Sequence, residues 1–122
     1  MRKGIFALLG LGCIVGAAIA VKRYRKFLAI IESGEATVID LRKKEDYDAY
    51  HLENAEHLDV ANAEWNLDQF DKDKLVVIYG YSFTDNLKVM HDFYRQGFRQ
   101  VHNAGSIEEL LKIKHSKDQK PE

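Results

Sequence analysis

The stretch from Lys74 to Gln96 constrains the fold most, because it has the pattern of a buried strand, a short loop and a helix. Residues 75–79 form a continuous apolar run, Leu-Val-Val-Ile-Tyr, typical of a strand covered on both faces. Asp85 or Asn86 can cap the helix that follows, and Gly97 suits the left-handed residue that ends it. In an open α/β sheet, the loop after such a strand usually carries the chemistry. The residues of this loop therefore decide the functional interpretation.

Shorter elements on both sides of this unit alternate between strand and helix. We expect helices at residues 24–33 and 107–113, helical turns at 43–50, and strands at 36–41, 56–60 and 98–103. The weakly amphipathic segment 61–70 is expected to cover the sheet with Trp65, Leu67 and Phe70. Ser106 and Glu109 have the spacing of a capping box, after a turn at Ala104-Gly105. The alternation predicts a small parallel β-sheet flanked by helices, an α/β fold.

An apolar segment precedes these elements. Residues 4–21 carry no charged side chain, and basic residues flank them at positions 2–3 and 22–26. A helix of this length spans about 27 Å, close to the roughly 30 Å of a bilayer core. The segment therefore predicts an uncleaved single-pass anchor, and the cations after it favour a bacterial inner membrane with the domain in the cytoplasm. We divide the chain into an anchor with basic flanks (1–26), a domain (27–115) and a polar tail (116–122).

Other interpretations of the apolar segment stay open. Ala18-Ile19-Ala20 resembles a signal-peptidase site, and cleavage there would export the domain to the periplasm. Gly12-Cys13 has some features of a lipoprotein site. Gly12, Gly16 and Ala20 form a stripe of small residues that can pack helix against helix, although ordinary glycine usage in a membrane span explains them as well.

Composition excludes several classes of site. The chain has 18 basic and 19 acidic residues and a net charge of -1, so no overall field attracts nucleic acid. The single cysteine, Cys13, excludes an intrachain disulfide and a cysteine-based zinc site. Four of the histidines, His57, His91, His102 and His115, show no metal-ligand spacing with acidic partners. We therefore predict no metal and no cofactor.

Three patches of sequence resemble one known family. The first is Val-Ile-Asp-Leu-Arg at 38–42, followed by Tyr47 and by His-Leu-Glu-Asn-Ala at 51–55. The second is the strand at 75–79, and the third is Gly97-Phe98 with Val101 and Asn-Ala-Gly at 103–105. Together they resemble the rhodanese-like domain over residues 27–111, and most of all the small single-domain rhodaneses of the phage-shock protein E type. The resemblance implies a parallel α/β fold and a sulfurtransferase-like scaffold.

The first patch contains three residues to which we assign structural roles. Asp40, at the end of a strand, can accept hydrogen bonds from loop amides, and Arg42 can brace a carboxylate. His51 combines a hydrogen-bonding edge with a flat apolar body and is suited to holding a loop. The resemblance implies the same, because in the family this signature supports the fold and does not react.

The second patch departs from the family where the chemistry takes place. In rhodaneses this strand ends in a nucleophilic cysteine, whose thiolate is stabilised by the loop amides and often by a nearby cation. The resemblance places that cysteine at Gly80, which has no side chain to carry sulfur. The family's loop glycine and arginine fall near Phe83 and Thr84, and Asp85 adds negative charge where an anion would dock. We therefore expect a degenerate loop without a catalytic residue: Gly80, Tyr81, Ser82, Phe83, Thr84 and Asp85.

These observations favour a membrane-anchored, non-catalytic rhodanese-like module with a binding or regulatory role. Its partner is an unknown protein or a small anion, and Tyr81 and Phe83 are candidate contacts unless one of them folds inward over the sheet. Two alternatives remain. One is a thiosulfate sulfurtransferase that uses an unrecognised residue, such as Ser82 or Thr84, and the other is a purely structural membrane protein.

Overall fold

The computed structural model of the chain describes residues 22–60 and 67–118. A helical segment at 22–33 opens the described part. It is followed, in chain order, by β1 (Thr37–Asp40), α2 (Lys44–Ala49), β2 (Ala55–His57), β3 (Val76–Gly80), α3 (Phe83–Arg95), β4 (Val101–Ser106) and α4 (Ile107–Asp118). The strands form one sheet in the order β2-β1-β3-β4, and every neighbouring pair is parallel. The predicted parallel α/β sheet flanked by helices is confirmed.

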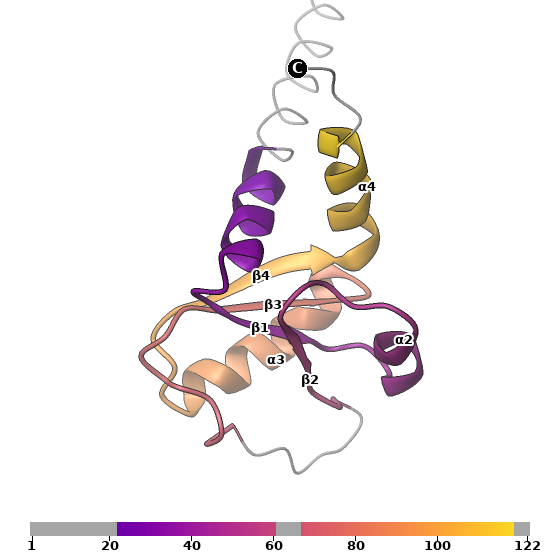
Figure 1. Cartoon of the computed structure of the whole chain (residues 1–122). Coiled ribbons are helices and arrows are strands. Elements are labelled where there is room, and N and C mark those ends of the chain that lie inside the picture. The colour runs from indigo at the N-terminus through magenta and orange to yellow at the C-terminus, as the bar shows by residue number, and fades with distance from the viewer. Residues whose placement is uncertain (1–21, 61–66, 119–122) are drawn as a thin grey trace, which may run out of the picture.

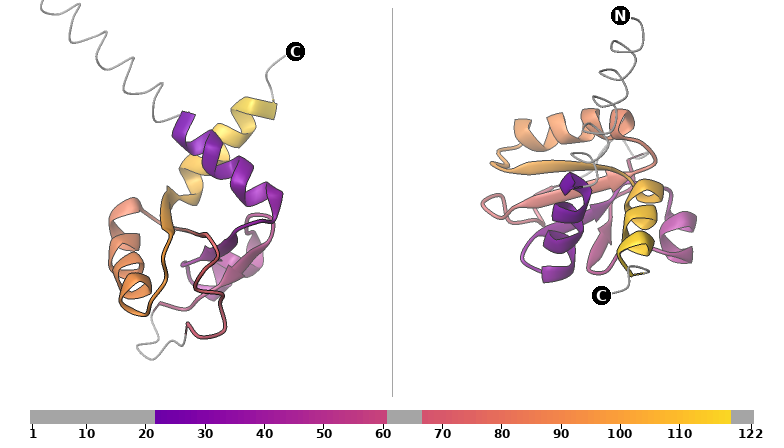
Figure 2. Two further views of the ribbon diagram at one scale, coloured as in Figure 1. Left: turned by 90° about the vertical axis from the view of Figure 1, so that its left-hand side faces the viewer. Right: turned by 90° about the horizontal axis from the view of Figure 1, so that it is seen from above.

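The helices cover the sheet on both faces (Figures 1 and 2). Helix 22–33 and α4 lie side by side on one face, and α3 lies on the other. The buried side chains of β3 alternate accordingly. Val77 and Tyr79 pack with helix 22–33 and α4, whereas Val76 and Ile78 pack with α3. All of these side chains are fully buried, so the prediction of a strand covered on both faces is confirmed.

The segment before β3 covers the sheet as expected. Leu67 and Phe70 are buried in the same apolar cluster as Val89 and Phe93 of α3. Trp65, the third residue predicted for this role, lies outside the described residues. The packing of Phe70 against Phe93, with ring centroids 6.5 Å apart, joins this segment to the helix.

Helix α3 begins earlier than its sequence predicts, and the predicted cap at Asp85 or Asn86 is wrong. Ser82 is the N-cap, because its Oγ accepts a hydrogen bond from the backbone N–H of Asp85 at 3.1 Å. The loop between β3 and α3 is therefore only Tyr81-Ser82. Asn86 falls inside the first turn, where its side chain points into the protein and is 1% exposed.

Strand β4 also differs from its prediction, since it runs from Val101 to Ser106 instead of ending at residue 103. Gly105 was expected to turn the chain, but it adopts φ +79° inside the strand, where the register with β3 shifts beside Gly80. A Cβ at Gly105 would stand 2.9 Å from the hydroxyl of Tyr24. Glycine here lets the strand continue while helix 22–33 packs closely on it. Gly97 has the positive φ that was predicted for it.

The predicted membrane anchor at 4–21 lies outside the described residues, as do Gly12, Cys13, Gly16 and Ala20. Within residues 22–60 and 67–118, no helix is both long and apolar enough to cross a bilayer.

Candidate functional site

The carboxyl ends of β1 and β3 lie next to each other at one edge of the sheet. β1 ends at Asp40, and β3 ends at Gly80. The two strands are hydrogen-bonded in register, with Asp40 opposite Tyr79. Because chemistry in parallel α/β sheets is usually found at this edge, the turns that follow these two strands form the candidate site.

The turn after β1 is held by a buried ion pair. Asp40 accepts a hydrogen bond from the backbone N–H of Arg42 at 2.9 Å, and the guanidinium Nη2 of Arg42 lies 2.7 Å from the second carboxylate oxygen. The same Nη2 donates to the carbonyl of Tyr50 at 2.6 Å. Burial alone lowers the pKa of Arg42, but the hydrogen bond and charge of Asp40 outweigh it, so this pKa lies above its ordinary value. Both charged groups are thus committed to holding the turn.

Aromatic and histidine side chains hold the turn after β1 and the segment between α2 and β2. Tyr79, whose pKa is raised by burial, accepts a hydrogen bond from the N–H of Leu52 at 3.0 Å. His57 Nε2 lies 2.7 Å from the carbonyl of Arg42. The ring of His51 stacks on Tyr47 with centroids 4.0 Å apart, and its Nδ1 is 2.9 Å from the Tyr47 carbonyl. Asp40, Arg42 and His51 therefore all make contacts within the fold.

A side chain at Gly80 would collide with the side chain of Asn86 in the turn after β3. A Cβ placed on Gly80 would stand 2.6 Å from Oδ1 of Asn86 and 3.4 Å from Cβ of Leu41. Carbon and oxygen atoms do not approach this closely without a shift of one of them. The space beside the end of β3 is therefore occupied by the side chain of Asn86.

Asn86 is held in that place by a buried polar network. Its Nδ2 donates to Oδ1 of Asn103 and to the carbonyl of Gly105, both at 2.9 Å. Asn103 in turn donates to the carbonyl of Phe83 at 2.9 Å and accepts from the N–H of Gly105 at 3.0 Å. The sequence did not predict this role for either asparagine, since Asn86 was expected only as a helix cap and Asn103 only as part of the third patch. The signal for Asn86 was its spacing, because Val89 and Phe93 follow it at i+3 and i+7 on the buried face of α3.

Tyr81 crosses from the β3–α3 loop to the segment that follows β1. Its hydroxyl donates a hydrogen bond to the carboxylate of Asp46 and accepts one from the backbone N–H of Lys43 at 3.2 Å. The hydrogen bond to Asp46 raises the pKa of the Tyr81 phenol above its ordinary value. The Tyr81 hydroxyl is therefore tied to the region of α2, while the side chain stays exposed and does not fold inward over the sheet. Phe83 remains exposed to solvent.

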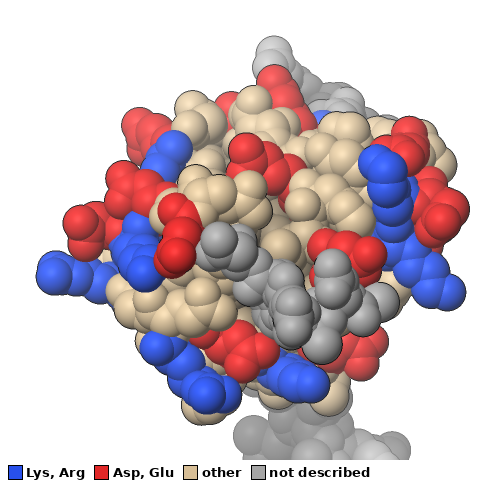
Figure 3. Space-filling view, turned by 90° about the horizontal axis from the view of Figure 1, so that it is seen from below, with Lys and Arg blue, Asp and Glu red and all other residues tan. Residues whose placement is uncertain are grey.

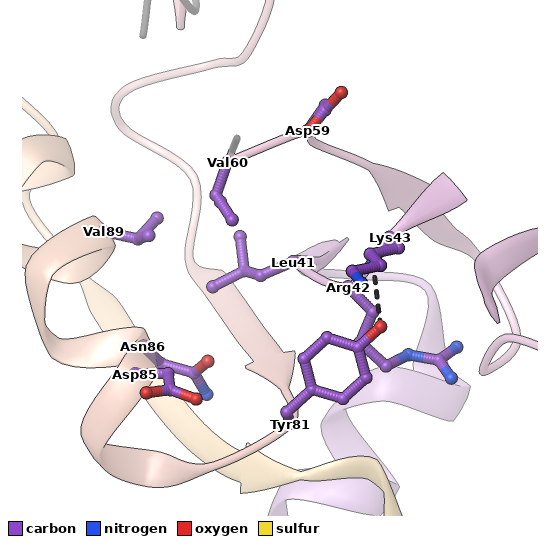
Figure 4. Close-up of a pocket in the computed structure, with 9 residues that line it drawn as sticks. All are labelled: Leu41, Arg42, Lys43, Asp59, Val60, Tyr81, Asp85, Asn86 and Val89. Atoms are coloured by element: carbon purple, nitrogen blue, oxygen red, sulfur yellow. Dashed lines mark hydrogen bonds between the residues drawn. The ribbon is translucent and has the colours of Figure 1, made fainter. Parts of the chain in front are cut away.

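A pocket of about 270 Å³ lies between the two turns (Figure 4). Its apolar surface comes from Leu41, Val60 and Val89, while Tyr81 lies across its other side. Asp85, also part of the lining, brings a carboxylate to the helix end of the pocket. The face seen from below the view of Figure 1 carries interspersed acidic and basic side chains and no field of a single sign (Figure 3).

Ser82 and Thr84, the two hydroxyl residues considered as nucleophiles, are poorly placed for catalysis. The hydroxyl of Ser82 serves as the cap acceptor of α3, and Thr84 is exposed on the first turn of that helix. In the described part of the chain, no group of three or more His, Cys, Asp and Glu side chains is arranged to hold a metal ion.

The sequence model that describes the rhodanese-like domain family matches residues 24–112, which is most of the chain. The chain belongs to the rhodanese-like family. It is 27% identical over 86 residues to the thiosulfate sulfurtransferase GlpE of Coxiella burnetii, a match that covers 70% of this chain and 80% of that protein.

Two solved structures share the fold. The Rhodanese_3-like domain of the Alr3790 protein from Anabaena sp. superposes with a TM-score of 0.56 at 18% identity, over 64% of this chain and 92% of that one. A second structure of the Alr3790 protein gives a TM-score of 0.50 at 19% identity, over 72% and 83%. This rhodanese-like chain therefore combines a family fold with a β3–α3 turn in which asparagine fills the space beside the strand end.

Proposed function

We propose that this domain is a rhodanese-like binding module without sulfurtransferase activity, held at a membrane by residues 4–21. The observation that carries the proposal is the 2.6 Å separation between a Cβ on Gly80 and Oδ1 of Asn86. By the family resemblance, Gly80 occupies the position of the nucleophilic cysteine. The chain has no side chain there, and the fold has filled the space that one would need.

The electrostatics of the pocket support the same proposal. Sulfur transfer from thiosulfate needs a thiolate, and an anionic donor is held best by cations and amides. Two cations, Arg42 and Lys43, and two carboxylates, Asp59 and Asp85, line the pocket, so its lining has no excess of positive charge. The Arg42 guanidinium is moreover hydrogen-bonded to Asp40 and to the carbonyl of Tyr50. The pocket is therefore poorly suited to an anionic sulfur donor.

The similarity to a protein named as a thiosulfate sulfurtransferase favours a second candidate, sulfur transfer through an unrecognised residue. The third candidate is a purely structural membrane protein. In that case, substitutions on the surface of the domain should have no effect on ligand binding, and only changes in helix packing within the membrane should matter. Association of the full chain that is lost in Gly16→Ile, with no ligand for the domain, would favour that third function.

A thiosulfate:cyanide assay of the purified full chain separates the first two candidates. In this reaction a thiolate takes the outer sulfur of thiosulfate, sulfite leaves, and cyanide then removes the sulfur as thiocyanate. We expect no thiocyanate above the blank from the natural chain or from Cys13→Ser. Thiocyanate formation that survives Cys13→Ser would overturn the proposal and support an unrecognised nucleophile.

The proposed membrane location has its own test. Alkaline carbonate should leave the full chain in the inner-membrane fraction, and its intact mass should include residues 1–21. Protease should reach the domain in inverted vesicles but not in spheroplasts. Loss of the N-terminal segment, or digestion in spheroplasts, would instead support export to the periplasm.

A further inference from the structure

Three large apolar side chains are exposed along one side of α3. Phe83 is 45% exposed, Leu87 39% and Tyr94 46%. They occupy positions i, i+4 and i+11, so they share one face over roughly 16 Å of helix. This α3 stripe (Phe83, Leu87 and Tyr94) lies roughly 100° around the helix from the buried face. The core therefore does not account for it.

At its Tyr94 end, the α3 stripe runs into a groove between helix 22–33 and the start of β4. The groove has a volume of about 510 Å³. Its apolar lining includes Ile30, Leu75 and Phe27, which is itself buried, and its other lining residues are Tyr94, Arg23, Lys26, Arg99, Gln100 and His102. Among the described residues that line the groove, the charged ones are basic and none is acidic. The α3 stripe and this groove form one amphipathic surface.

The other side of the α3 stripe is basic as well. His91, Thr84, Arg95 and Lys88 are exposed and occupy the next positions around the helix, and Arg95 and Lys88 carry the positive charge. The carboxylate of Asp92 lies 3.8 Å from Arg95, further round on the side away from the stripe. Arg99 also pairs with Asp73, at 3.4 Å and at an exposed site where such pairs contribute little. Positive charge therefore borders the apolar surface on both sides.

This charge distribution selects between a second copy of the chain and a different partner. In a two-fold pair of α3 stripes, basic borders would face basic borders, which is unfavourable. An acidic partner, in contrast, would be attracted by the basic residues on both sides of the α3 stripe. The surface is also hollowed by the groove, which suits an inserted side chain better than a flat bilayer.

The edge of the sheet determines which kind of partner segment fits. β4 is an edge strand, and an extended peptide can in general add to such an edge. Here the hydroxyl of Tyr94 donates to the carbonyl of Val101 at 3.1 Å and accepts from its N–H at 3.2 Å. These bonds occupy the backbone groups with which strand addition would begin. A helix, which needs no backbone partners, is compatible with the surface.

We propose that the α3 stripe and the adjoining groove bind an acidic amphipathic helix of a partner protein. The apolar face of that helix packs on Phe83, Leu87 and Tyr94, and its carboxylates face the basic borders. The inference rests on the proposed function as a binding module and gives it a surface separate from the pocket beside Gly80.

The inference can be tested by fluorescence anisotropy, in which the full chain in detergent micelles is titrated into each of two labelled peptides. Micelles without protein serve as the blank. One peptide is a helix of leucines at i, i+3, i+4 and i+7 with glutamate elsewhere, and the other carries lysine in place of glutamate. We expect saturable binding of the acidic peptide alone. Leu87→Asp should weaken it by about tenfold or more, as for a central apolar contact. Lys88→Glu, an exposed charge change that leaves packing intact, should weaken it and reduce its salt dependence.

Matched controls carry the same chemical changes elsewhere. Val60→Asp alters an apolar residue of similar exposure at the pocket beside Gly80, and Lys44→Glu reverses a charge on α2. Both should leave peptide binding unchanged. Equal binding of the two peptides, no saturable binding, or weakening by Val60→Asp would overturn the inference. So would binding to phosphatidylglycerol vesicles that requires Leu87 when the acidic peptide fails to bind. Thiocyanate formation by the natural chain would instead contradict the proposed function and leave the peptide result standing.

Discussion

The turns after β1 and β3 lie side by side, yet they are built in opposite ways. The β1 turn buries two opposite charges, Asp40 and Arg42, and satisfies both with hydrogen bonds. The β3 turn has no charged group at its centre, and a neutral amide, Asn86, fills the place beside Gly80. A site can therefore match a family in its supporting turn while the adjacent reactive position has been packed as part of the core.

The largest expected effect comes from breaking the β1 turn. Asp40→Ala removes one member of a buried ion pair and leaves the Arg42 guanidinium with only the Tyr50 carbonyl. We expect a loss of about 3–5 kcal/mol in the free energy of unfolding, measured by chemical denaturation. The matched control is Asp48→Ala, which removes the exposed partner of Lys44 and should cost less than about 1 kcal/mol. Similar costs for the two variants would mean that the buried pair does not hold the turn.

The second test concerns packing at the β3 turn. Gly80→Ala introduces the Cβ that would contact Asn86, and overpacking of this kind costs about 1–3 kcal/mol. In an Asn86→Ser background the shorter side chain vacates the space, so the cost of Gly80→Ala should fall. A double-mutant cycle measured by denaturation gives the coupling directly. Additive costs would show that Asn86 does not occupy the space next to Gly80.

A smaller effect tests where α3 begins. Ser82→Ala removes the side chain that accepts from Asp85 N–H and should cost about 1 kcal/mol of stability. Thr84→Ala changes an exposed hydroxyl two residues later, and thermal unfolding should hardly register it. If Thr84→Ala proves the more costly variant, the helix starts later than Ser82.

The smallest effect is on the titration of the Tyr81 phenol. Hydrogen bonding to Asp46 raises its pKa in the folded state, so the bond favours folding below the ordinary tyrosine pKa of about 10 and is lost as the pH rises through the raised value. The difference in alkaline absorbance between the natural chain and Tyr81→Phe isolates this phenol. Asp46→Asn should return its titration toward the ordinary range. Titration of Tyr81 below that range would contradict the hydrogen bond.

Much of the fold could be predicted from the sequence because its signals are periodic. The uninterrupted apolar run of β3 indicated burial on both faces, and the alternation of elements indicated a parallel sheet. The ends of elements were less predictable. Ser82 caps α3 instead of Asp85, and Gly105 continues β4 instead of turning the chain.

The site was predictable only in outline, since its decisive contacts join residues distant in sequence. The absence of a thiol at Gly80 was evident from the sequence alone. That Asn86 fills the space depends on Asn103 and Gly105, which lie on β4, 17 and 19 residues further along the chain. Likewise, no local pattern connects Tyr81 to Asp46. Phe83 was a candidate contact by its exposure, but its grouping with Leu87 and Tyr94 required the helix to be placed against β4.

The central claim is that Asn86 occupies the space that a reactive side chain at Gly80 would need. Intact-mass spectrometry after incubation with thiosulfate tests it most directly, using the full chain in a Cys13→Ser background so that the introduced thiol is the only one. Our account predicts that Gly80→Cys with Asn86→Ser gains the mass of one sulfur atom, whereas Gly80→Cys alone does not. Equal sulfur uptake by the two variants would show that the space is already open and would contradict the account.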